Sequence, residues 1–100
     1  MTNETTHPSG GLQFEPDTID NLQRRLRKIE GQVRGIQAMI ADDRDCREIV
    51  TQIAATNKAL EQVGFVMVSA GLTWCIKNPE QSAEAGYDVA DVQKMFLKLA

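Results

Sequence analysis

Two long runs of apolar residues, each repeating at intervals of three and four, constrain the fold of this chain most strongly. The first run comprises Ile19, Leu22, Leu26, Ile29, Val33, Ile36 and Ile40, and the second comprises Ile49, Ile53, Thr56, Leu60, Val63, Met67, Ala70 and Trp74. Such spacing places side chains along one stripe of an α-helix. No segment alternates apolar and polar residues as a strand does. The sequence therefore predicts an all-α fold.

The ends of the two long helices are marked by residues that begin or stop helices. Pro16 and Asp17 suit a first helical turn, so the first helix should begin at one of them. The polar run at 42–45 interrupts the apolar pattern and predicts a tight hairpin between antiparallel helices. The second helix should then extend from about residue 44 to residue 77, where Asn78 and Pro79 stop it.

The remaining segments are shorter. Residues 79–86 are predicted to form a loop, after which Asp88 should cap a short third helix. Residues 1–14 are polar and contain Gly, Ser and Pro, so we expect a flexible tail in which His7 is solvated. Residues 15–100 are then a single helical domain.

A two-helix hairpin of this kind cannot bury all of its apolar surface by itself. Each long helix keeps a second apolar flank, and covering it calls for another hairpin. The sequence therefore predicts a dimeric four-helix bundle. Gly64, in the middle of the second helix, either admits a closely packed partner helix or reflects sequence drift, because a glycine there costs about 1 kcal/mol relative to alanine.

Composition limits the functions open to the chain. With 100 residues, a net charge of −3 and a pI near 5.0, it is not a general polyanion binder, so any nucleic-acid contact needs a local basic patch. The N-terminus has neither the basic nor the apolar region of a signal peptide. We expect a cytoplasmic protein without a membrane segment, in which cysteines stay reduced.

The only two cysteines, Cys46 and Cys75, lie 29 residues apart on the second predicted helix. At 100° per residue they point within about 20° of the same direction, but the helical rise separates them by about 43 Å. They can meet only between chains, if a second copy lies antiparallel about a two-fold axis near Leu60. This pattern is typical of an oligomeric thiol or metal switch.

The chemistry open to these thiols is limited by their surroundings in the sequence. There is no CxxC motif, and His7 is the only histidine, so the sequence argues against an enzyme. Two thiolates fall short of the four ligands of a zinc site. Two-coordinate Cu(I) and reaction with oxidised sulfur species both remain open. A buried cysteine that acts only as a small apolar residue is the simpler alternative.

A basic cluster on the first helix is the candidate nucleic-acid surface. It comprises Arg24, Arg25, Arg27, Lys28 and Arg34. By itself the cluster could be a solvated face with i,i+4 ion pairs, such as Asp20 with Arg24. Duplicated in an oligomer, it would be large enough to hold phosphates.

Two segments resemble the copper-sensitive operon repressor family, the CsoR/RcnR group. These segments are RLRKIEGQVRGIQAMIADDRDC at 25–46 and QIAATNKALEQVGFVMVSAGLTWC at 52–75. The resemblance implies an all-α tetramer, built as a dimer of dimers, that binds operator DNA without a helix-turn-helix and leaves it when an inducer binds at the dimer interface.

The resemblance also assigns roles to individual residues. Cys46 and Cys75 correspond to the two inducer-binding cysteines, while the histidine that copper, nickel, cobalt and formaldehyde sensors need is replaced by Gly71. Asp45 replaces a tyrosine that is common in copper sensors. The pattern of two cysteines without the histidine resembles the persulfide-sensing CstR branch.

The same resemblance bears on the DNA contacts. Arg25 corresponds to a DNA-binding arginine of the first helix. A second-helix arginine used by some members is Gln62 here, with Lys58 as a possible substitute. Three hypotheses follow: a repressor released by persulfide or polysulfide, which leads; a Cu(I)-sensing repressor that uses two thiolates; and a helical-bundle interaction protein without DNA binding. No resident metal or cofactor is expected, with Cu(I) as the alternative.

Overall fold

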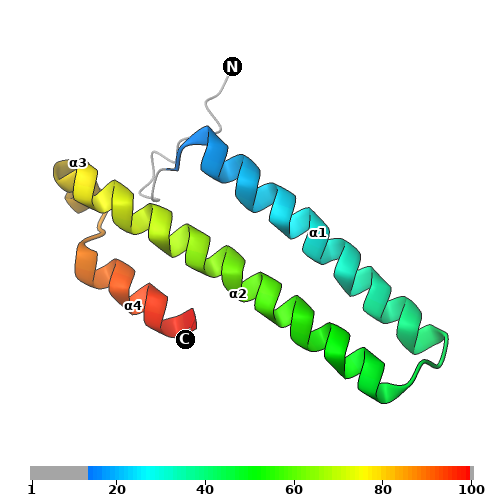
Figure 1. The fold of residues 1–100 in the computed structure, drawn as a ribbon. Coiled ribbons are helices and arrows are strands. Elements are labelled where there is room, and N and C mark those ends of the chain that lie inside the picture. The colour runs from blue at the N-terminus through cyan, green and yellow to red at the C-terminus, as the bar shows by residue number, and fades with distance from the viewer. Residues whose placement is uncertain (1–13, 100) are drawn as a thin grey trace.

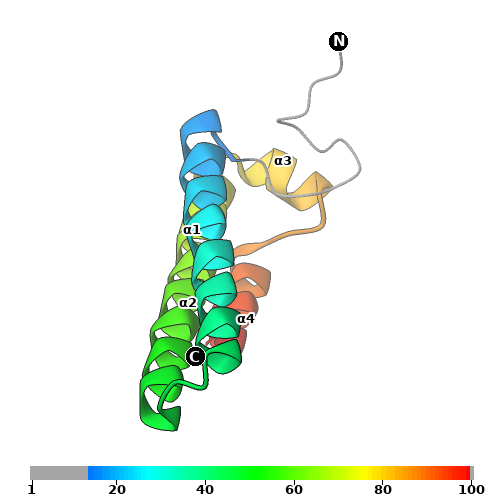
Figure 2. The same cartoon turned by 90° about the vertical axis from the view of Figure 1, so that its right-hand side faces the viewer.

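The structure is a computed structural model that describes residues 14–99. It contains the helices α1 (Pro16–Ala41), α2 (Cys46–Lys77), α3 (Pro79–Glu84) and α4 (Val89–Leu99). α1 and α2 form an antiparallel hairpin, and α4 folds back along α2 (Figure 1). Viewed after a 90° turn, the short α3 projects near one end of the hairpin (Figure 2). The described residues contain no strand, so the predicted all-α class is confirmed.

The hairpin between α1 and α2 forms where the sequence predicts it. Asp43 adopts a left-handed conformation (φ 61°), and the backbone N–H of Arg44 donates to the carbonyl of Met39 at 3.0 Å. This pattern ends a helix by satisfying its last carbonyls. The Asp45 carboxylate then accepts a hydrogen bond from the backbone N–H of Arg47 at 2.8 Å, which caps α2 and makes Cys46 its first residue.

The prediction of a loop over residues 79–86 is wrong, because Pro79–Glu84 forms the helix α3. Pro79 occupies the first turn, where its missing N–H costs no hydrogen bond. The buried hydroxyl of Ser82 donates to the carbonyl of Tyr87 and holds the following turn. The predicted third helix is therefore the fourth, and Asp88 caps it as expected by accepting from the backbone N–H of Asp91 at 2.8 Å.

The core of the single chain is small. Leu22 and Ile29 of α1 pack with Val63 of α2, flanked by partly buried alanine and valine side chains. Val92 of α4 is the most deeply buried apolar side chain. The radius of gyration is 17.2 Å, whereas about 13 Å is typical of a compact domain of this length. One chain therefore forms a thin layer of helices and leaves much of its apolar surface exposed.

Gly64 of α2 lies against the C-terminal end of α4. A Cβ atom at Gly64 would lie 2.7 Å from Cδ2 of Leu99, so the Leu99 side chain would have to move to admit it. The structure thus adds close packing of α4 to the two explanations that the sequence allows. The contact between Gly64 and Leu99 therefore helps to set the position of α4.

This contact predicts that one substitution has different effects on stability in two backgrounds. We expect Gly64→Ala to leave the free energy of unfolding of the wild-type protein nearly unchanged, because the gain of about 1 kcal/mol in helix propensity offsets the cost of moving the flexible end of the Leu99 side chain. In a Leu99→Ala background the same substitution should be stabilising. Urea unfolding followed by circular dichroism measures both values. Equal stabilisation in the two backgrounds would show that Leu99 does not pack on Gly64.

Candidate thiol pair and nucleic-acid interface

The two cysteines lie at opposite ends of one uninterrupted helix. Cys46 is the first residue of α2 and is exposed, whereas Cys75 lies two residues before its end and is only 4% exposed. Both are free thiols. Because α2 has no break, the helical rise keeps them about 43 Å apart. Within one chain they cannot share a ligand or a covalent bond.

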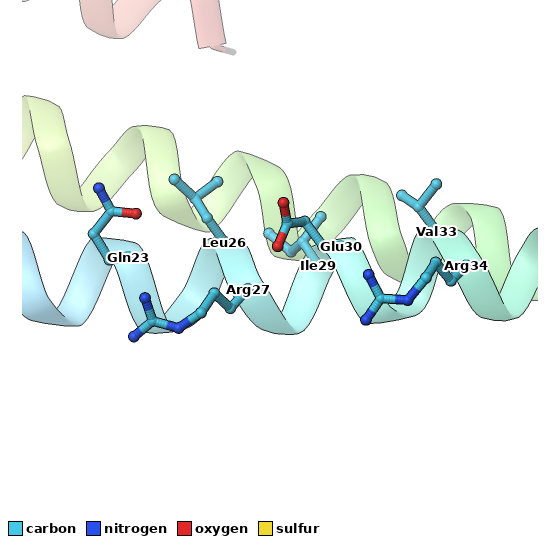
Figure 3. A pocket seen from close by; sticks show the side chains of 7 residues that line it. All are labelled: Gln23, Leu26, Arg27, Ile29, Glu30, Val33 and Arg34. Atoms are coloured by element: carbon cyan, nitrogen blue, oxygen red, sulfur yellow. The ribbon is translucent and has the colours of Figure 1, made fainter.

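One side of the hairpin carries a long row of exposed apolar side chains, here called the apolar face. It comprises Leu26, Val33 and Ile40 of α1 with Val50, Ile53, Leu60 and Met67 of α2. The helical phases of these residues place both sets on the same side of the hairpin. Figure 3 shows Leu26 and Val33 together with Arg27 and Arg34, whose side chains line the same groove along α1. On α2, the exposed Cys46 precedes this face by one turn, and the buried Cys75 follows it by about two turns.

The apolar character of α2 extends over much of its length. By length and composition alone α2 could cross a membrane, since its most apolar window has a mean hydropathy of 1.4. The sequence was not expected to contain such a segment. Only 17% of this window is buried within the chain. Leu60, at the centre of the helix, is 51% exposed, so the apolar surface of α2 needs a further partner.

Gly71 is buried one turn before Cys75 and supplies no side-chain donor. The described residues contain no group of three His, Cys, Asp or Glu side chains able to hold a metal ion. His7 and the rest of the predicted tail, apart from Phe14, lie outside the described residues. A metal held by described side chains would therefore depend on thiolates from two chains.

The basic cluster of α1 is free of ion pairs within residues 14–99. The ion pairs found there are Arg44 with Glu48 and Arg47 with Asp45, both at the hairpin. The i,i+4 pair of Asp20 with Arg24 that a merely solvated face would favour does not form. Arg24, Arg27, Lys28 and Arg34 are exposed, and so are Lys58 and Gln62 on α2. These cations are consequently available to bind an anionic partner.

Arg25 differs from the other basic residues because it is half-buried and anchored. Its Nε donates a hydrogen bond to Oδ1 of Asn21 at 3.0 Å. Sequence reasoning missed this contact, although the i,i+4 spacing of Asn21 and Arg25 was a signal for it. By helical phase, both side chains lie on the flank of α1 away from the apolar face.

Comparison with known proteins identifies relatives over most of the chain. The metal-sensitive transcriptional repressor family model matches residues 18–98. The chain is 39% identical over 69 residues to the copper-sensing transcriptional repressor RicR of Mycobacterium tuberculosis, covering 69% of this chain and 72% of that protein. It is 33% identical over 79 residues to the copper-sensing transcriptional repressor CsoR of Bacillus subtilis, covering 79% of this chain and 78% of that protein.

A third relative is the uncharacterized protein YrkD of Bacillus subtilis, 36% identical over 61 residues, which cover 61% of this chain and 92% of that protein. No solved structure matches the chain. The matches to RicR and CsoR each span more than two thirds of both proteins. The family model, which matches residues 18–98, includes nearly all of α1 and the whole of α2.

The apolar face predicts self-association that a central charge should disrupt. We expect Leu60→Glu to lower the oligomeric state, because a carboxylate at the middle of the face would lose its hydration on association. Gln62→Glu is the matched control, since it adds the same charge two residues away and off the face. Sedimentation velocity at several concentrations measures both variants. An unchanged assembly in Leu60→Glu would place the interface elsewhere.

Proposed function

Because this chain belongs to the metal-sensitive transcriptional repressor family, we propose that it is an operator-binding repressor whose DNA affinity is set at paired cysteines between subunits. Members of this family are transcriptional repressors and not enzymes. The controlling site would be formed by Cys46 of one protomer and Cys75 of the partner subunit. As a DNA-binding regulator, the protein would act in the cytoplasm.

The observation that carries this proposal is the exposed apolar row on α2, with the exposed Cys46 near one end of the helix and the buried Cys75 near the other. A second α2 packed antiparallel about a two-fold axis near Leu60 would cover the row. The same operation would bring Cys46 against Cys75 of the partner subunit at two equivalent sites. The resulting four-helix bundle, doubled into the tetramer that the family resemblance implies, would complete the core that one chain lacks.

The unpaired cations of α1 are the proposed operator surface. Arg25 is the residue that the family resemblance assigns to DNA, and Lys58 would replace the second-helix arginine that Gln62 has displaced. By helical phase, Arg24, Arg25 and Lys28 lie away from the apolar face, so dimerisation would leave them accessible and double their number. Arg27 and Arg34 line a groove together with Leu26 and Val33, so they lie at the edge of that face. Neutralising phosphates with such side chains gives binding that weakens steeply with salt.

Gly71 favours a sulfur species as the inducer, because the position that would complete a three-ligand metal site has no donor. The exposed Cys46 thiolate would attack the sulfane sulfur of a low-molecular-weight persulfide, forming a Cys46 persulfide and releasing the thiolate of the donor. Cys75 of the partner subunit would then attack the Cys46 sulfur, giving an inter-chain disulfide and releasing HS⁻. The sulfane sulfur is thus reduced as the two thiols are oxidised.

Cu(I) is the second candidate, and the names of two relatives favour it. RicR and CsoR are both named copper-sensing repressors. Cu(I) is a soft cation that thiolates select, so Cys46 and Cys75 of the partner subunit fit it as a two-sulfur donor set. Bound there, it would supply a coordinate link between two subunits.

Cross-linking tests the pairing of the cysteines. We expect inorganic polysulfide to produce a species of about twice 11.1 kDa on a non-reducing denaturing gel, because a disulfide would join two chains. Either Cys46→Ser or Cys75→Ser should abolish this species. A cross-link that persists in one of the single variants would mean that the remaining cysteine pairs with the same cysteine of the partner subunit, so that Cys46 and Cys75 need not pair across chains.

Restoring a histidine at position 71 separates the two candidate inducers. Gly71→His should raise Cu(I) affinity at least tenfold above wild type, because it adds an imidazole donor one turn from Cys75. Gly71→Gln controls for added bulk without imidazole. Competition with a Cu(I) chelator measures all three proteins. Wild-type affinity equal to that of Gly71→His would favour copper over persulfide.

A further inference from the structure

We propose that Asn21 is a positioning residue that holds the Arg25 guanidinium ready to bind a phosphate of the operator. This inference rests on the proposed function, since it specifies how one side chain of the DNA surface is organised. Neither the family match nor the relatives assign any role to Asn21.

The hydrogen bond between Asn21 and Arg25 leaves the two terminal nitrogens of the Arg25 guanidinium free to donate. Nε of Arg25 donates to Oδ1 of Asn21 at 3.0 Å in a partly buried setting. The guanidinium is planar and has five N–H donors, so binding at Nε orients the other four as a rigid fork. Such a fork matches two oxygens of one phosphate.

The other cations of the cluster have no comparable anchor. Within residues 14–99, the side chains of Arg24, Arg27, Lys28 and Arg34 make no hydrogen bond or ion pair, and all four are exposed. Each of them must lose rotamer freedom when it binds DNA. Arg25 has already lost much of that freedom in the free protein.

Apart from its contact with Arg25, asparagine is an unfavourable residue for helix stability at position 21. It lies inside α1, beyond the first turn that begins at Pro16, where asparagine forms helix less readily than alanine. Its side chain caps no helix end, and its one side-chain hydrogen bond among the described residues is with Arg25. A role in holding Arg25 accounts for an unfavourable residue on this flank.

The test is DNA binding as a function of salt, with a duplex that the wild-type protein selects from a random-sequence pool. Asn21→Ala should weaken binding by about three- to tenfold for each copy of Arg25 engaged, with the slope of log K against log salt unchanged, because no charge is removed. Arg25→Ala should also flatten that slope by about one for each phosphate that is no longer neutralised. Alanine favours the helix, so weaker binding by Asn21→Ala cannot come from unfolding.

A double-variant cycle decides whether Asn21 acts through Arg25. In an Arg25→Ala background, Asn21→Ala should have no further effect, whereas a purely structural role would give the same loss of affinity in both backgrounds. Measurement at low salt keeps the weakened variants bound. Gln81→Ala, which removes an exposed amide from α3, is the control. Wild-type affinity in Asn21→Ala, or an equal weakening in both backgrounds, overturns the proposal; failure of the wild-type protein to bind overturns the proposed function with it.

Discussion

The rise of an unbroken 32-residue helix is the constraint on which the rest of this molecule depends. It keeps Cys46 and Cys75 far apart while leaving them in phase, so their chemistry requires a second chain. The same helix carries an apolar window of which only 17% is buried, and this surface supplies the reason for a second chain to bind. The thiol pairing and the assembly would therefore have one physical origin.

The packing of α1 on α2 separates the two surfaces that the proposed function needs. Leu22 and Ile29 turn toward Val63, and this contact fixes the rotation of α1 about its axis. The exposed apolar residues of α1 then lie on one side of the hairpin, and Arg25 lies on the opposite flank. Self-association through the apolar face would leave Arg25 free.

Local patterns predicted the two long helices well, but they did not predict α3 or the packing of α4. The three–four apolar spacing and the polar run at 42–45 were sufficient for α1, α2 and the hairpin. Pro79 was interpreted only as the stop of α2, although proline also suits the first turn of a new helix. Nothing near Gly64 in the sequence indicates Leu99, because their packing depends on how α4 folds back. The pairing of Cys46 with Cys75 of the partner subunit was predicted from spacing alone, and both the pairing and its chemistry stay predictions.

Control of DNA binding by the thiols requires that the inducer distinguish two arrangements of the subunits. A ligand that binds both arrangements with equal affinity does not shift the equilibrium between them, however tightly it binds. A link between Cys46 and Cys75 of the partner subunit would set the spacing of two α2 helices. Since α1 is packed on α2 through Leu22 and Ile29, a change in that spacing would carry Arg25 with it.

Phosphates on a duplex have fixed positions. A pre-oriented Arg25 that moves rigidly with its helix would therefore no longer reach its phosphate, whereas a freely rotating side chain could follow the phosphate. The anchoring of Arg25 by Asn21 would thus make operator binding sensitive to the thiol chemistry as well as tighter.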